Sequence, residues 1–312
     1  MRRAANPPLS SPGEAALAQY QQVLWEEEDL TGASRRNYLS DLRHFIAWCE
    51  AGSVKRTDEI ALDQSEFDPR AVSTPALIRY RTYLQTDQRQ KPNSVNRALI
   101  SLKRYWSWAW QRQLIASDPS APVKLVGEEE HAPRHLEDRE EHALVAAVTH
   151  EGKLRDRVLI VLLLHTGLRA RELCQLRRDQ VSLSKRSGTL EIIGKRNTYR
   201  DVPLNATART LLEEYLPTLP PETVFLFSSP KRAAALSERA LGYIVKKYAD
   251  AAHLSDVSPH DLRHRFGYRM AEAVPLHRLA QIMGHDSLDT TRIYVQGTKH
   301  DLQQAVETIA WA

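Results

Sequence analysis

The sequence predicts a mainly α-helical protein with one small antiparallel β-sheet, an α+β fold in two domains. Apolar residues recur at helical spacing through the first hundred residues and again after Asn205. Between Val181 and Leu204 the period changes to two, and turn residues separate the short apolar runs. A stretch rich in Pro, Ser, Gly and Glu, residues 117–133, separates the two helical regions and predicts a linker.

The first region, residues 14–116, is expected to be a helical domain behind a flexible tail at residues 1–13. Four amphipathic helices are predicted, at Glu14–Glu28, from Ser34 to Gly52, from Thr74 past Leu84, and from Asn93 to about Leu114. Trp106 and Trp110 lie four residues apart on the last of these, so both are predicted to face the core.

The second region, residues 134–298, starts with a predicted helix at Glu137–Thr149. The apolar run Val158–Leu164 fits a helix or a buried strand on pattern alone, and the absence of a turn at Arg157 favours a helix. The alternating segments form a hairpin, and helices follow to the end of the chain. Residues 299–312 carry an apolar stripe that predicts a C-terminal helix.

Composition narrows the class of protein. The net charge of +4 and the pI near 9.0 are compatible with a polyanionic partner. The sequence contains no apolar run of 18 residues and no secretory leader, so we expect a cytoplasmic, nucleoid-associated protein without a membrane partner. Cys49 and Cys174 are expected to be free thiols in a reducing compartment.

Four groups of polar residues in the second region are unusual together. They are Thr166-Gly167-Leu168-Arg169 with Glu172, Gly194-Lys195 at a hairpin tip, His260-Asp261-Leu262-Arg263-His264, and Gly284-His285 with Tyr294 nine residues later. Two arginines can meet the negative charge that develops on a phosphodiester in the transition state. A tyrosine can be the nucleophile, and a lysine can protonate the leaving oxygen.

In order and spacing these groups resemble the tyrosine recombinase (phage integrase) family, whose pattern places an Arg, a hairpin Lys, His-x-x-Arg, Gly-His and a Tyr. The resemblance covers about residues 134–298, and the first region is similar to the family's SAM-like core-binding domain. It implies a C-shaped clamp on DNA, and it is strongest toward Xer-type and simple transposon or plasmid recombinases. The positions that match the pattern are Arg169, Lys195, His260, Arg263, His285 and Tyr294.

The resemblance implies a role for each of these residues. Arg169 and Arg263 bind the scissile phosphate, His285 donates to a nonbridging oxygen, and His260 acts as a base or orients the site. Lys195 is the general acid, and Tyr294 forms the 3′-phosphotyrosyl intermediate. The hairpin lacks the family's usual second Gly and second Lys, so Lys185 in the preceding turn stays open as a donor. No cofactor, metal or ATP is implied.

The implied partner is double-stranded DNA with a specific core site. A homo- or hetero-tetramer on two sites is implied, with the C-terminal helix docking on a neighbouring subunit or packing on its own. Candidate DNA-binding residues on the second and fourth helices are Arg35, Arg36, Arg43, Arg97, Lys103 and Arg104.

Three other functions compete with this hypothesis. A type IB topoisomerase uses a similar set of residues and reseals the same strand. A zinc hydrolase could bind metal through His260 and His264, with Asp261 at the position of a base. A DNA-binding regulator could keep the fold without catalysis, although the intact set of six residues argues against that.

Overall fold

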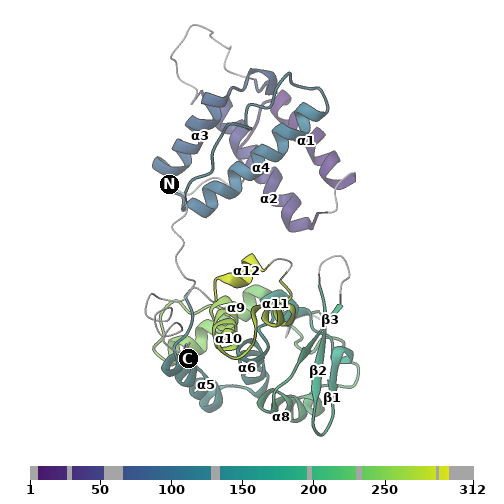
Figure 1. Ribbon diagram of the computed structural model, residues 1–312. Helices are drawn as coiled ribbons and strands as arrows, with labels where there is room; N and C mark the ends of the chain where they lie inside the picture. The colour runs from purple at the N-terminus through teal and green to yellow at the C-terminus, as the bar shows by residue number, and fades with distance from the viewer. Residues whose placement is uncertain are drawn as a thin grey trace, which may run out of the picture. The chain divides into compact units, whose positions relative to one another are not determined.

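The computed structural model of the protein divides into two compact units, Met1–Glu130 and His131–Ala312 (Figure 1). It describes residues 6–26, 30–52, 66–127, 134–194, 199–229, 234–285 and 288–294. Both units are built mainly from helices, and the second also holds a three-stranded antiparallel sheet. The predicted fold class is therefore confirmed.

The first unit contains the four predicted helices. They are α1 (Ser11–Glu26), α2 (Gly32–Glu50), α3 (Thr74–Thr86) and α4 (Pro92–Gln111), with the short 3-10 helix η1 (Pro69–Ala71) before α3. The second helix begins two residues before the predicted Ser34, because the Thr31 side chain accepts a hydrogen bond from the Ser34 amide and caps it. Both α3 and α4 have proline in their first turn, where its missing N–H costs nothing.

Large aromatic side chains fill the core of this unit. Phe45 lies edge-on to Tyr80 and to Trp106, and all three are fully buried. The prediction for Trp110 is wrong: this residue is 51% exposed, because the fully buried Ala109 takes the core-facing position in the last turn of α4. Trp106 is buried as predicted.

The second unit contains the remaining elements. They are α5 (Asp138–Glu151), α6 (Leu154–Thr166), α7 (Ala170–Gln175), η2 (Arg178–Gln180), β1 (Val181–Leu183), β2 (Gly188–Ile193), β3 (Tyr199–Pro203), α8 (Ala206–Tyr215), η4 (Leu216–Thr218), α9 (Glu238–Ala251), α10 (Pro259–Ala273), α11 (Leu276–Met283) and α12 (Asp289–Arg292). The ambiguous apolar run is a helix, since Val158–Leu164 lies inside α6.

Helix α6 is the centre of the second unit. Every residue from Val158 to Leu164 is buried, which is expected of a helix that is apolar on all sides. Helices α5, α8 and α10 all pack against it. The helix that carries Arg263 is therefore fixed to the core of the unit.

The sheet has the order β1-β2-β3, and both pairs are antiparallel. Ile192 of β2 pairs with Arg200 of β3, close to the hairpin between the two strands. Residues 195–198 of that hairpin, Lys195 among them, lie outside the described residues, as does the predicted C-terminal helix. Across the described segments, no helix combines the length and apolar character needed to cross a membrane.

Candidate active site

Arg263 lies in the second turn of α10 and is 3% exposed. Its Nη1 donates to the Gly167 carbonyl, and its Nη2 donates to the Met283 carbonyl at 3.1 Å and to Nε2 of His285 at 2.8 Å. Burial, and next the nearby Arg169 charge, lower the pKa of Arg263 to about 10. The guanidinium thus stays charged at neutral pH and is held in one orientation.

Arg169 is the residue just before α7, and its side chain is 44% exposed. Its amide and its Nη1 donate to the Glu172 carboxylate at 2.8 and 2.9 Å. Its Nη2 donates to the Gly284 carbonyl at 2.6 Å. Arg263 binds the carbonyl of Met283, one residue earlier, so one turn at the end of α11 holds both guanidinium groups.

Gly167 makes this approach of α6 and α10 possible. It ends α6 in the left-handed region with φ of +61°, where a glycine is favoured. A Cβ at this position would lie 2.3 Å from Cδ1 of Phe266. Any larger residue would push α10 away from the turn that carries Arg169.

His285 connects Arg263 to α12. Because a guanidinium can only donate, Nε2 of His285 is the acceptor from Arg263, and Nδ1 donates to Oγ1 of Thr291 at 2.7 Å. Burial, and next the Arg263 charge, lower the pKa of His285 to about 4. The imidazole is therefore neutral and fixed in one tautomer.

Tyr294 is 6% exposed and lies among aromatic rings. Its ring is edge-on to Tyr268 at 5.2 Å and stacks at 6.3 Å from the ring of His285. Its hydroxyl lies 3.0 Å from Nδ1 of His264. Burial raises the pKa of Tyr294 to about 12, although the Arg263 charge opposes this shift.

The contact between His264 and Tyr294 was missed by the sequence reasoning, which considered His264 only as a zinc ligand. His264 is 7% exposed, and burial lowers its pKa to about 4. His260, one helical turn earlier, is exposed, and its ring lies 4.2 Å from that of His264. The structure thus brings His264, and not His260, to the tyrosine hydroxyl.

Two residues of the zinc hydrolase alternative, the base Asp261 and the ligand His264, have other partners. Asp261 accepts hydrogen bonds from the amide and hydroxyl of Ser258 at 2.8 and 2.6 Å, so it caps α10. Nδ1 of His264 faces the tyrosine hydroxyl. Within the described part of the chain, no group of three or more His, Cys, Asp or Glu side chains could hold a metal ion.

Lys185 is not near this cluster. It is exposed in the turn between β1 and β2, at the Gly188 end of β2. The cluster lies near the other end of that strand, where Arg200 of β3 binds Glu172. Six residues of extended strand span about 17–20 Å. Lys185 is therefore a poor donor for the same site.

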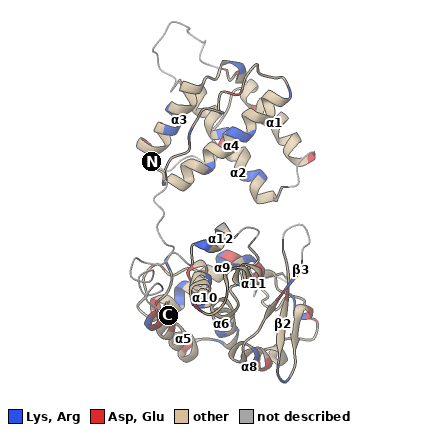
Figure 2. Ribbon diagram, in the orientation of Figure 1, with Lys and Arg blue, Asp and Glu red and all other residues tan. Residues whose placement is uncertain are grey.

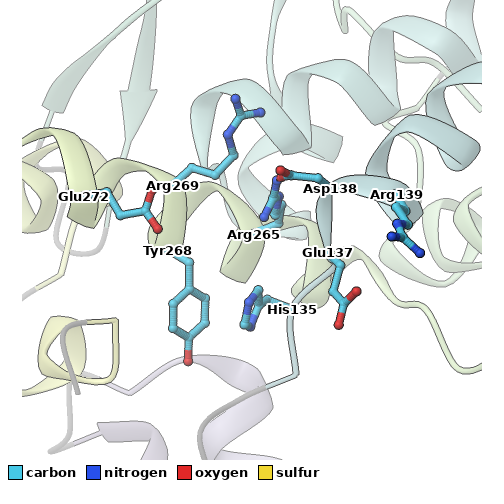
Figure 3. Close-up of a pocket in the computed structure, with 8 residues that line it drawn as sticks. All are labelled: His135, Glu137, Asp138, Arg139, Arg265, Tyr268, Arg269 and Glu272. Carbon is cyan, nitrogen blue, oxygen red and sulfur yellow. The ribbon is translucent and has the colours of Figure 1, made fainter. Parts of the chain in front are cut away.

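A pocket lies beside the cluster, between the start of α5 and the last turns of α10 (Figure 3). Arg265 reaches from α10 to Asp138 and Glu141 of α5, at 2.6 Å from the latter, and Arg269 also binds Glu141 at 3.0 Å. These ion pairs connect α10 to the start of α5. The pocket contains none of the six predicted site residues.

Lys and Arg residues occur along both α2 and α4 of the first unit (Figure 2). The six of them that are candidates for DNA binding differ in their surroundings. Arg43 binds Glu14 through two hydrogen bonds at 2.6 and 2.7 Å, and Arg97 binds the buried Asp41 at 2.5 Å. The others have these surroundings: Arg35 lies over Trp25, Lys103 donates to the Ser120 carbonyl, Arg104 lies over Tyr38, and Arg36 is exposed.

Comparison with known proteins gives concordant matches. Residues 134–300 match the phage integrase family, and residues 17–113 match the phage integrase N-terminal SAM-like domain. Tyrosine recombinase XerD of Shewanella oneidensis is 30% identical over 290 residues, 90% of this chain and 91% of that protein. XerD of Pseudomonas aeruginosa is 30% identical over 305 residues, 95% of this chain and 97% of that protein.

Solved structures agree on the fold. The crystal structure of the XerH site-specific recombinase bound to palindromic difH substrate, a post-cleavage complex, has a TM-score of 0.71 at 21% identity. The match covers 93% of this chain and 84% of that one. The two XerD relatives, at 30% identity, favour site-specific recombination over the topoisomerase alternative.

Proposed function

Because this chain belongs to the phage integrase family of tyrosine recombinases, we propose that it recombines DNA at specific sites with Tyr294 as its nucleophile. Attack of the phenolic oxygen on the scissile phosphorus forms a 3′-phosphotyrosyl bond and releases a 5′ hydroxyl. Attack by the 5′ hydroxyl of a partner strand reverses this step, so the bond energy is kept and no ATP is used.

The observation that carries the proposal is the pair of arginines at one turn. Arg169 and Arg263 donate to the consecutive carbonyls of Gly284 and Met283, and His285 follows directly in the chain. Two fixed guanidinium groups can bind the nonbridging oxygens and stabilise the extra charge of the five-coordinate transition state.

Phosphate binding would change the hydrogen bonds of His285. In the DNA-free protein, Nε2 of His285 accepts a hydrogen bond from Nη2 of Arg263, so Nε2 cannot donate to an oxygen. A phosphate oxygen can replace it as the acceptor for Arg263. The same anion raises the pKa of the imidazole, so that Nε2 becomes protonated and donates to the phosphate.

The tyrosine and the leaving group each need a proton transfer. Tyr294 leaves its contact with His264 to reach the phosphorus, and His260 assists as a base or by orienting the site. Lys195, which follows β2 in the chain, protonates the 5′ oxygen. Charge stabilisation by the arginines means that no metal is required.

The DNA partner follows from the relatives, whose structures include a recombinase on its difH site. We propose that both units bind a specific core site. Arg36 is the foremost candidate among the six residues for phosphate contact, because Arg43 and Arg97 are bound by carboxylates. In the recombining complex, four subunits, identical or of two kinds, bind two DNA sites. Residues 299–312 of each subunit dock on a neighbouring subunit.

A suicide substrate tests the proposal. A nick placed just beside the scissile phosphate lets a short fragment diffuse away, so that the phosphotyrosyl intermediate accumulates. Wild-type protein should give a covalent protein–DNA band in denaturing electrophoresis. Tyr294→Phe should bind the same DNA and give none; a band that persists in this variant contradicts the proposal.

A further inference from the structure

We propose that Arg200 is a positioning residue for the phosphate ligand Arg169, and that it acts through Glu172. Arg200 belongs to β3 and is not among the residues that match the family pattern. The inference rests on the proposed function, because it takes Arg169 to be a ligand of the scissile phosphate.

Arg200 and Glu172 form a two-pronged ion pair. Nη1 and Nη2 of Arg200 donate to Oε1 and Oε2 of Glu172 at 3.0 and 2.9 Å. The side chains are 15% and 9% exposed, so solvent screens this pair weakly. Burial opposes the charge of Glu172, and the hydrogen bonds from Arg200 and Arg169 overcome it, so the pKa of Glu172 is lowered.

Glu172 is shared evenly by the two arginines. Oε1 also accepts from Nη1 of Arg169 at 2.9 Å, and Oε2 also accepts from the Arg169 amide at 2.8 Å. Each carboxylate oxygen therefore receives one N–H from each arginine. Since all four bonds are made, the carboxylate has one favoured orientation, and it fixes the start of the Arg169 side chain.

Arg200 also supports the second anchor of Arg169, the Gly284 carbonyl. Its Nε donates to the Ile282 carbonyl at 3.2 Å, two residues before Gly284. A Cβ at Gly284 would lie 2.6 Å from Cζ of Arg200, so the guanidinium lies flat against this backbone. Nη2 of Arg169 binds the carbonyl of that same residue. The contacts form a closed ring from Arg169 through Glu172, Arg200 and the end of α11 back to Arg169.

Charge gives Arg200 a second effect on Arg169. Without Arg200, Glu172 would neutralise the charge of Arg169 and compete with the phosphate for the Arg169 guanidinium. With Arg200 present, the three groups sum to one net positive charge, so Arg169 remains cationic toward an incoming phosphate. An arginine with 44% of its side chain exposed would otherwise lose its position and part of its effective charge.

The variants separate geometry from charge. Arg200→Met removes both, and Arg200→Lys keeps the charge but cannot bind both carboxylate oxygens. Arg209→Met is the matched control, because Arg209 of α8 is also half-buried and donates to a backbone carbonyl, that of Leu204. It packs against Gly188, at the far end of β2. Thermal melting and gel shift first establish that each variant folds and binds DNA.

Three substrates then identify the step that Arg200 serves. They carry an ordinary scissile phosphate, a methylphosphonate that lacks one nonbridging charge, or a sulfur at the 5′ bridging position. On ordinary phosphate we expect Arg200→Met to slow single-turnover cleavage about 10²-fold, the usual loss when one charge-stabilising donor is misplaced, and Arg200→Lys to lose less. On methylphosphonate the deficit relative to wild type should shrink to about 3-fold or less, since there is less charge to stabilise.

The outcomes distinguish this inference from the proposed function. The sulfur substrate should not relieve Arg200→Met; relief by sulfur would mean that Arg200 serves the hairpin lysine, and an equal deficit on all three substrates would mean a purely structural role. Either result overturns the inference. Arg169→Ala must itself be relieved by methylphosphonate. If Arg169→Ala is relieved and Arg200→Met is not, only the inference fails; if Arg169→Ala is not relieved, the proposed role of Arg169 fails as well.

Discussion

The hydroxyl of Tyr294 lies 3.0 Å from Nδ1 of His264, and both side chains are buried. The pKa of Tyr294 is raised to about 12 and that of His264 is lowered to about 4. Proton transfer between them is unfavourable by on the order of 10 kcal/mol. In the DNA-free enzyme this contact therefore stabilises a neutral phenol, and cleavage requires Tyr294 to leave it.

Gly267→Ala should displace the tyrosine. A Cβ on this α10 residue would lie 2.5 Å from Cε1 and Cζ of Tyr294, so the ring must leave its place. We expect the second unit to lose about 1–3 kcal/mol of stability, and the Tyr294 absorbance to titrate nearer pH 10 in a difference spectrum against Tyr294→Phe. The control is Gly242→Ala in α9, where a Cβ meets nothing within 4 Å; it should be neutral or stabilising by about 1 kcal/mol. A Tyr294 titration unchanged in Gly267→Ala would contradict the packing described.

Acid should destabilise the second unit before most carboxylates titrate. His264 and His285 have pKa values lowered from 6.5 to about 4, so the unfolded chain binds protons first as the pH falls. Their contribution to stability is complete above pH 6.5 and is lost as the pH falls toward 4. His264→Asn should reduce the pH slope of the free energy of unfolding by up to about 1.4 kcal/mol per pH unit. Urea titrations from pH 7 to 4.5 measure the slope, with His277→Asn, at an exposed site on α11, as the matched control. An equal slope in His264→Asn and wild type would show that His264 is not buried as a neutral group.

Lys195→Ala should lose protonation of the leaving oxygen. On ordinary DNA we expect cleavage to slow by about 10²–10⁴-fold, because a 5′ alkoxide is a poor leaving group. A 5′ bridging sulfur leaves without a proton and should restore most of the rate. Lys185→Ala serves as the control and should cleave like wild type. If the sulfur restores cleavage by Lys185→Ala and not by Lys195→Ala, then Lys185 is the general acid.

Chelation should not inhibit the enzyme. Arg169 and Arg263 supply the positive charge that a metal ion would otherwise bring to the phosphate. Full cleavage of the suicide substrate is expected in excess EDTA. Loss of cleavage that zinc restores, together with zinc binding that His260→Ala abolishes, would support the hydrolase alternative.

Much of the fold was predictable because it depends on local patterns. The period of the apolar residues gave the four helices of the first unit and the sheet of the second. It did not predict which residue of a turn faces the core, and Trp110 was misassigned because Ala109 takes the buried position in the last turn of α4.

Only those residues of the candidate site that belong to the family's sequence pattern could be predicted. Arg169, Arg263, His285 and Tyr294 do lie in one cluster. His264 and Arg200 were missed, because their partners lie 30 and 28 residues away in the chain. Such contacts depend on how α10, α12, β3 and α7 pack, and no periodicity or spacing in the sequence encodes them.

Identification of the residue bound to DNA tests the central claim most directly. The covalent complex formed on the suicide substrate can be digested with nuclease and protease, and the modified peptide located by tandem mass spectrometry. The account predicts a nucleotide joined through its 3′ phosphate to Tyr294. A nucleotide on another tyrosine, above all the neighbouring Tyr268 whose ring lies 5.2 Å from that of Tyr294, would contradict it.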